Sequence, residues 1–437
     1  MQADTGTIFP IRGRGLERAL LAGGPTESPG AAEQIGTSSQ REASGSPRGD
    51  VFVELVRRPE ELFLLREEWD RLYGRASEPY MWQGYEWIRT VWDLLAEPQG
   101  HGLHCIIVRN AGRIVLIWPL ALVRHRRLWT AVVPLAGLGD YHDILVEASP
   151  ESLRFARLAW TFLRRSCPAD LIRFDHVRAD SLLFKVLCED GIAPRWGEPS
   201  PYIAWNDTPD WDSYWRSIGK SLRGHVDRSY RRLGERGAVA LELMTGGERY
   251  GQAIAWMLRH KRDWLVRKRH SSSTWLGSTG YERLLASAPD RISKDGHIAV
   301  FALTLDAEIL AVQVNYVEPS RVLFMHPAYD PAYEKYRPGH ILMKLVLRWT
   351  LEQGKSYDFM YGAQDYKLQF SKSREEIAIM SVPCTIRGHL HERMTACIRA
   401  LRSSRLGSLM KSEARPGPVG SERSRHLRSA APASAGP

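Results

Sequence analysis

Apolar residues recur along the chain with two different periods. Within residues 59–73 an apolar side chain returns to one helical face every three or four positions, which predicts an amphipathic helix. Residues 103–109 and 113–123 are instead short apolar runs, separated by a polar turn that contains a glycine. Two such runs predict a β-hairpin.

The same criteria predict alternating helices and strands over residues 51–401. Helices are expected at 59–73, 84–96, 150–166, 180–189, 209–236, 247–268, 279–288, 339–353, 364–371 and 388–401. Strands are expected at 103–109, 113–123, 128–135, 170–176, 201–205, 238–244, 297–305, 308–317, 321–326, 356–361 and 376–386. This alternation predicts an α/β fold with mixed sheets.

The order of the elements occurs twice. HCIIVRNAGRIVLIWPLAL in the first half and AVFALTLDAEILAVQVNYV in the second share the pattern of strand, tight polar turn and strand. We therefore expect two similar tandem units, residues 51–205 and 206–390, although any two α/β domains share much of this pattern. Residues 1–50 lack periodicity and are expected to be disordered, and residues 391–437 to form a terminal helix and a disordered basic tail.

Charge and cysteine usage narrow the class of protein. The net charge of +10 suits phosphate-bearing or acidic ligands, and equally an ordinary basic surface. The five cysteines are scattered without metal-ligand spacing, so we expect reduced thiols in a cytoplasmic protein and no metal site. The longest apolar stretch, Cys105–Val123, is interrupted by charged and glycine residues, so no membrane insertion is expected.

The turn Arg337-Pro338-Gly339-His340 opens an apolar-periodic helix directly after a strand. The first turn of a helix offers free amide groups and a partial positive charge, which together bind phosphate. Arg337 and His340 add further contacts in this interpretation, and Gly339 allows a ligand to approach the backbone. An ordinary helix start with proline and glycine explains the same residues.

Two polar segments are candidates for chemistry. Asp140, His142 and Asp143 form an acidic turn at the end of a strand, where a carboxylate or imidazole can accept a proton from an attacking amine or hydroxyl. Tyr366 and Lys367 follow another strand, and they can protonate a leaving thiolate and stabilise an oxyanion. Turn and capping chemistry explains the aspartates equally, and a solvated short helix explains the lysine.

The basic helix expected at 209–236 suggests a wall of positive charge for an anionic substrate or for phosphates, although charge runs are usually solvated faces. The sequence contains no recognisable helix-turn-helix, RNA-binding strand motif or zinc finger, so a specific nucleic-acid partner is not expected.

Several short motifs occur in an order that resembles the GNAT acetyltransferases, in the CelD-type branch associated with cellulose and exopolysaccharide biosynthesis. That branch is similar to the Fem-type transferases, which also pair two GNAT units. The motifs are Trp69-Asp70-Arg71-Leu72, Trp118-Pro119-Leu120, Asp140 to Asp143, LRGHVDRSYRRLGERG at 222–237, Tyr336 to Gly339, Asp358-Phe359, Gly362 and Tyr366-Lys367. They cover about residues 51–385. The phosphate turn departs from the family pattern because it holds one glycine.

The resemblance implies two tandem GNAT-like units, with acyl-CoA as co-substrate in the second. The expected reaction is direct transfer of an acyl group, acetyl above all, to an amine or hydroxyl of a small molecule or saccharide precursor. Polysaccharide-synthesis proteins would be partners. Two alternatives stay open: a Fem-like transferase that uses aminoacyl-tRNA, and a non-catalytic accessory protein of a polysaccharide-synthesis complex.

Overall fold

The computed structural model describes residues 41–44, 51–125, 129–135, 141–205, 210–267, 279–291 and 296–403. Asp140 therefore lies outside the described residues, as does most of both predicted tails. Arg41–Ser44, inside the segment expected to be disordered, forms strand β1 against β2.

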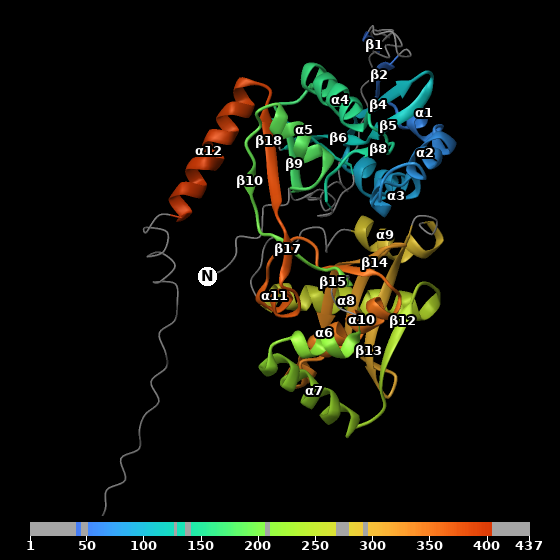
Figure 1. Cartoon of the computed structure of the whole chain (residues 1–437), viewed down its shortest axis with the longest axis vertical. Helices are drawn as coiled ribbons and strands as arrows, with labels where there is room; N and C mark the ends of the chain where they lie inside the picture. The colour runs from blue at the N-terminus through green and yellow to red at the C-terminus, as the bar shows by residue number, and fades with distance from the viewer. Residues whose placement is uncertain are drawn as a thin grey trace, which may run out of the picture.

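The first unit contains two sheets with helices packed against them (Figure 1). Its strands are β2 (Val51–Val56), β3 (Gly102–Leu103), β4 (Cys105–Asn110), β5 (Arg113–Trp118), β6 (Leu120–His125), β7 (Trp129–Pro134), β8 (Leu145–Val146), β9 (Leu171–Arg178) and β10 (Arg195–Trp196). Its helical segments are α1 (Pro59–Phe63), α2 (Arg66–Tyr73), η1 (Met81–Gln83), α3 (Tyr85–Val91), η2 (Trp92–Ala96), η3 (Glu97–Gln99), α4 (Ser152–Ser166) and α5 (Leu182–Glu189).

The second unit is built on one seven-stranded sheet. Its own strands are β12 (Val239–Met244), β13 (His297–Leu305), β14 (Glu308–Val317), β15 (Arg321–Tyr329), β16 (Ser356–Asp358) and β17 (Ser373–Glu375). Its helices are α6 (Trp211–Ser217), α7 (Lys220–Gly234), α8 (Gly247–Arg267), α9 (Thr279–Arg291), η6 (Pro331–Tyr336), α10 (Pro338–Glu352) and α11 (Asp365–Phe370). Helix α12 (Ile386–Ser403) ends the described chain.

The two units exchange one strand each. Strand β11 (Ser200–Ile203) leaves the first unit and pairs with β16 and β17 of the second. Strand β18 (Ile377–Pro383) leaves the second unit and pairs with β9 and β10 of the first. Strand pairing therefore crosses the predicted boundary near residue 205 in both directions, and the division into 51–205 and 206–390 describes the sequence rather than the sheets.

Strand order is the same in both units once the exchange is taken into account. The second sheet runs β12-β13-β14-β15-β16-β11-β17. In the first unit the matching path is β2-β4-β5, then β6-β7-β9-β18-β10. In each unit one helix, α4 or α10, connects two strands that pair in parallel, β7 with β9 and β15 with β16. The predicted α/β fold with mixed sheets and two similar tandem units is confirmed.

Three of the predicted elements are each divided into two in the structure. The strand expected at 113–123 is divided at Pro119, which has no amide to donate to a sheet, and the chain there passes from one sheet to the other. The helix expected at 209–236 is divided at Ile218 and Gly219, whose backbone is extended. The helix expected at 59–73 is likewise two helices, with Leu64 and Leu65 between them.

The second sheet is buried on both faces, because alternate residues of a strand point to opposite sides. In β13, Phe301 and Leu303 pack with α7 and α10, whereas Val300 and Ala302 join a core that continues into the first unit. The ring of Tyr316 lies 5.4 Å from that of Trp82 in the first unit. The two units therefore share a hydrophobic core. None of the helices in the described ranges is long and apolar enough to cross a membrane.

Candidate functional site

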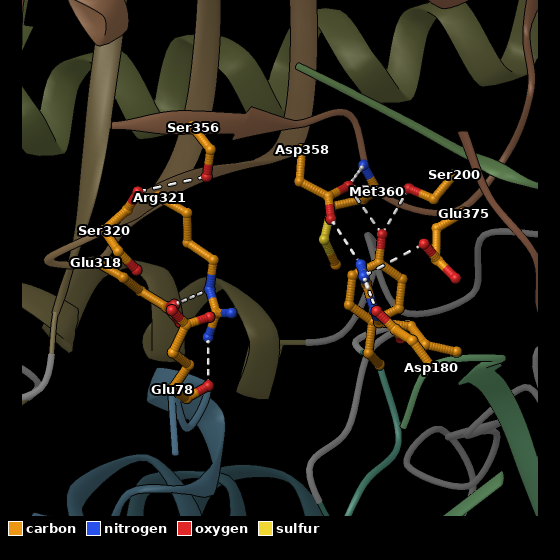
Figure 2. A network of polar contacts seen from close by, with 12 residues as sticks. Glu78, Asp180, Ser200, Glu318, Ser320, Arg321, Ser356, Asp358, Met360 and Glu375 are labelled. Atoms are coloured by element: carbon orange, nitrogen blue, oxygen red, sulfur yellow. Dashed lines mark hydrogen bonds and ion pairs between the residues drawn. The ribbon is translucent and has the colours of Figure 1, made fainter. Parts of the chain in front are cut away.

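Asp358, the last residue of β16, is the centre of a buried hydrogen-bond network between the units (Figure 2). Its Oδ1 accepts hydrogen bonds from the Tyr141 hydroxyl at 2.8 Å, the Ser200 hydroxyl at 2.9 Å and the Met360 amide at 2.7 Å. Tyr141 belongs to the first unit, and Ser200 to the exchanged strand β11. The network therefore depends on the strand exchange.

Arg178, at the end of β9, supplies the positive charge of this network. Its guanidinium donates to Asp180 at 2.7 Å and to Asp358 at 3.4 Å, and it lies 5.3 Å from the centre of the Tyr141 ring. Burial by itself would lower the pKa of Arg178, but the hydrogen bond to Asp180 and the nearby acidic groups raise it above its usual range. Arg178 is thus a permanent cation.

A second network joins the start of β15 to the first unit (Figure 2). Arg321 forms an ion pair with the buried Glu318 and donates to the carbonyl oxygens of Glu78 and Pro79 at 3.0 and 3.1 Å. Glu318 also accepts the Met81 amide at 2.7 Å. These contacts fix the segment before η1 against the second unit.

A cavity of about 430 Å³ lies beside these two networks. Its wall includes four acidic residues, Glu78, Asp143, Glu147 and Asp180, and the two arginines Arg178 and Arg321. Glu147 forms an ion pair with Arg75, Asp180 with Arg178, and Arg321 with Glu318. Within the described residues Glu78 and Asp143 form no direct ion pair, although Arg321 lies near Glu78 and Arg178 near Asp143. The wall thus carries four carboxylates against two guanidinium groups, an excess that favours a positively charged group.

Asp143, predicted as a base, lines this cavity and also caps a helix. Its Oδ1 accepts the amides of Ile144 at 2.9 Å and Leu183 at 3.0 Å, the latter in the first turn of α5. Burial raises the pKa of Asp143 to about 6, against the lowering effect of these two hydrogen bonds. No hydrogen bond to Oδ2 is found in the described part of the chain, so one carboxylate oxygen can accept a proton.

His142 is the neighbouring candidate. Burial, together with the nearby ring of His176, lowers the pKa of His142 to about 3, so the imidazole is neutral at physiological pH. Its Nδ1 is buried and has no hydrogen-bond partner among the residues described. His142 can accept a hydrogen bond, but it is a weak base.

Strands β15 and β16 separate after a short parallel ladder. They pair only from Arg321–Leu323 to Ser356–Asp358, although β15 continues to Tyr329. After Asp358 the chain turns away through Met360, whose φ of 59° lies in the left-handed region. A residue with a side chain is strained there, and the Asp358 carboxylate holds the Met360 amide in place.

Lys367 lies buried beside this separation. Its Nζ donates to the carbonyl oxygens of Tyr361 at 3.1 Å and Met360 at 3.4 Å, and it lies 5.4 Å from the centre of the Phe324 ring. Burial lowers the pKa of Lys367 to about 7. Such a lysine exchanges a proton near neutral pH, whereas an exposed one does not. Burial raises the pKa of its neighbour Tyr366, which therefore keeps its proton.

A second lysine, Lys261 on α8, is a candidate that sequence reasoning missed. Its Nζ lies 3.4 Å from the Pro327 carbonyl on β15, and burial lowers its pKa to about 8. It also contributes to lowering the pKa of Lys367. The signal was present, because Lys261 continues the buried stripe of α8 that includes Ile254 and Leu258.

The predicted phosphate turn forms the first turn of α10, which begins at Pro338. Arg337 caps the helix in the left-handed region, with φ of 51°. The amides of His340 and Ile341 donate to the Arg337 carbonyl, at 3.0 and 3.2 Å, so Gly339 is left as the amide without a recorded partner in the described chain. Arg236, at the end of the basic segment after α7, donates to the Tyr336 hydroxyl at 3.4 Å and so adds charge near this turn.

The predicted catalytic residues thus fall into two groups. Asp143 and His142 line the cavity, while Lys367 contacts Met360 on the other side of Asp358. Tyr141 and Met360 both bond to Asp358 and so link the groups. No group of three His, Cys, Asp or Glu side chains that could hold a metal ion is found within the ranges the structure describes.

Part of the second unit is similar to a known protein family. Residues 220–368 match the family model of the acetyltransferase (GNAT) domain. No curated protein matches the chain in sequence. The solved structure of FemX is 12% identical, with a TM-score of 0.53, and covers 75% of this chain and 97% of its own.

Two further structures resemble the chain more weakly. A tandem GNAT protein from the clavulanic acid biosynthesis pathway is 11% identical, with a TM-score of 0.45 over 76% of this chain and 99% of its own. A protein of Bacteroides thetaiotaomicron is 8% identical, with a TM-score of 0.48 over 75% of this chain and 99% of its own. At 12% identity, the likeness to FemX describes the fold alone. The match of residues 220–368 to the acetyltransferase (GNAT) domain agrees with the predicted GNAT-type acyltransferase.

Proposed function

We propose that the chain transfers an acyl group from acyl-CoA to a primary amine of a small molecule or saccharide precursor. The observation that carries this proposal is the separation of β15 and β16 inside the matched GNAT domain, with Lys367 buried beside it. The separated strands leave backbone groups unpaired by the sheet, and a donor chain can pair with them.

The phosphates of the donor are assigned to the turn from Arg337 to His340. The free amide of Gly339, the N-terminus of α10 and the guanidinium of Arg236 supply the positive potential. The turn follows η6 directly after β15, so a donor bound there can extend along β15 toward Lys367.

The acceptor is assigned to the cavity beside Tyr141. The wall carries four carboxylates against two arginines, an excess of negative charge that favours an ammonium group over a neutral hydroxyl. The ammonium must lose its proton before the nitrogen attacks the thioester carbonyl. Asp143 accepts that proton on Oδ2, a role that its pKa of about 6 allows at neutral pH.

The remaining steps use the residues around Met360. The carbon–nitrogen bond forms as the amine attacks, the carbonyl oxygen becomes negative, and the carbon–sulfur bond then breaks. Lys367 in its charged form stabilises the oxyanion. Tyr366 gives its proton to the departing thiolate, and the second proton that the attacking nitrogen loses replaces it on Tyr366. Transfer is direct, without an acyl-enzyme intermediate.

An aminoacyl-tRNA donor is the second candidate. The fold likeness to FemX favours it, together with the exposed basic residues Arg228, Arg231 and Arg232 of α7. A role in cellulose or exopolysaccharide biosynthesis, with partners from a polysaccharide-synthesis complex, rests on the CelD-type resemblance alone.

Titration calorimetry with acetyl-CoA distinguishes the donors. We expect saturable binding by the wild-type chain and weaker binding by a variant in which Gly339 is replaced by valine. Lys220→Met, a change at an exposed lysine in the first turn of α7, is the matched control. Absence of acetyl-CoA binding, with acyl transfer only from aminoacyl-tRNA, would replace the proposal by the second candidate.

A further inference from the structure

Helix α12 (Ile386–Ser403) follows the exchanged strand β18 and extends beyond the sheet at the edge of the first unit (Figure 1). One side of the helix is packed. Gly388 is buried so closely that an added Cβ would lie 2.0 Å from the Asp170 carbonyl oxygen. The His391 ring lies 4.2 Å from that of Trp129, and Glu392 accepts a hydrogen bond from Ser381 at 2.8 Å.

The opposite side of α12 is an apolar stripe in solvent. It consists of Ile386, Leu390, Met394 and Ile398, which are 88%, 58%, 56% and 47% exposed. Their spacing of four residues places them on one face of the helix. A contiguous exposed apolar surface of this kind marks a site of interaction with a protein or a membrane.

Positive charge accompanies the stripe. Arg387 and Arg393 are exposed on either side of it, and Glu392 is the only acidic residue of the helix. From residue 386 to the end, the sequence has ten Lys or Arg against three Asp or Glu, which is +7 of the net charge of +10. A partner that covers this helix must therefore be apolar and anionic at once.

We propose that α12 docks on the surface of an anionic lipid membrane, with Ile386, Leu390, Met394 and Ile398 in the boundary between headgroups and acyl chains. An amphipathic helix with an apolar stripe and basic flanks binds such a surface without spanning it. The 18 residues of α12 include four arginines, which agrees with a helix that lies in the interface. A second copy of the chain fits less well, because pairing two stripes would bring like charges together.

Co-sedimentation of the full chain with vesicles tests this proposal. The probes are vesicles of phosphatidylcholine with about 25% phosphatidylglycerol, and vesicles of phosphatidylcholine alone. We expect binding to the anionic vesicles that weakens as salt is raised. Replacing both Arg387 and Arg393 by glutamine should weaken binding by about 30-fold, since each basic residue near such a surface contributes about fivefold.

Replacing both Leu390 and Met394 by glutamine should weaken vesicle binding by at least about tenfold, because both side chains lose apolar area to bury. Both residues are exposed, so the fold should be kept. The matched control replaces the exposed Arg228 and Arg232 of α7, at the other end of the molecule, by glutamine (Figure 1). This control removes as much positive charge as the replacement of Arg387 and Arg393, and it should bind the anionic vesicles like the wild type.

Three results would overturn the proposal. The first is binding that does not distinguish anionic from neutral vesicles. The second is an equal loss of binding in the α7 control, which would make the effect one of net charge alone. The third is a dimer in sedimentation velocity that disappears when Leu390 and Met394 are replaced, without vesicle binding, because the occupant would then be a second copy.

Discussion

Replacing Lys367 by methionine should make the stability of the protein less dependent on pH. Lys367 is 4% exposed, and burial lowers its pKa from 10.5 to about 7. Between these two pKa values the unfolded chain holds a proton that the folded chain has lost, so the free energy of unfolding rises as pH increases. Below pH about 7 both states are protonated, and the dependence ends.

The magnitude follows from the two pKa values. Each unit of pKa difference corresponds to about 1.4 kcal/mol, so charging Lys367 in the fold costs about 5 kcal/mol. Integrated between pH about 7 and about 9, the contribution of Lys367 to the free energy of unfolding rises by about 2 kcal/mol. The methionine variant lacks this contribution.

Urea unfolding followed by tryptophan fluorescence measures this difference. We expect the gap between wild type and Lys367→Met to change by about 2 kcal/mol over this pH range, and the gap between wild type and Lys220→Met to stay constant. A constant gap for Lys367→Met would show that the lysine keeps an ordinary pKa. The reasoning that makes it a proton-exchanging group at the site would then be refuted.

Three further predictions concern the site. Gly339→Val should weaken acetyl-CoA binding without unfolding the protein, because the added Cβ would meet nothing nearer than Tyr329 at 4.0 Å; thermal unfolding checks the fold and calorimetry the binding. Asp143→Asn should lower turnover by about 10²- to 10⁴-fold and leave acetyl-CoA binding intact. In the wild type, kcat/KM should fall as pH drops below about 6, where the carboxylate gains a proton, and steady-state rates across pH will show whether the variant loses this step. Asp358→Ala should cost about 3 to 5 kcal/mol in chemical denaturation, because Arg178 is left with one buried partner fewer, whereas a loss under 1 kcal/mol would make the network unimportant for stability.

Local elements were predictable because their signals are local. The hairpins, the start of α10 at Pro338 and the alternation of helices and strands follow from spacing and turn residues. The strand exchange was not predictable, because β11 pairs with strands more than 150 residues away. Nothing near Ser200 indicates which sheet it joins.

The site was predictable in part for the same reason. Asp143 and Lys367 were identified from their neighbours in sequence, but their environments depend on distant groups. Asp143 accepts a hydrogen bond from the amide of Leu183, and Lys367 is buried beside Phe324. Asp358 entered the sequence analysis only as part of the motif Asp358-Phe359, although it joins the two units. Lys261 was missed because its position on the apolar face of α8 matters only when β15 packs against it.

The most direct test of the account is mass spectrometry of the products formed from acetyl-CoA and a mixture of small amines, amino sugars and matched hydroxyl compounds. The account predicts acetylation at nitrogen, one free CoA released for each acetyl group transferred, no requirement for tRNA, and loss of product in Asp143→Asn. Acetylation confined to hydroxyl groups, or a product that appears only with aminoacyl-tRNA, would contradict it.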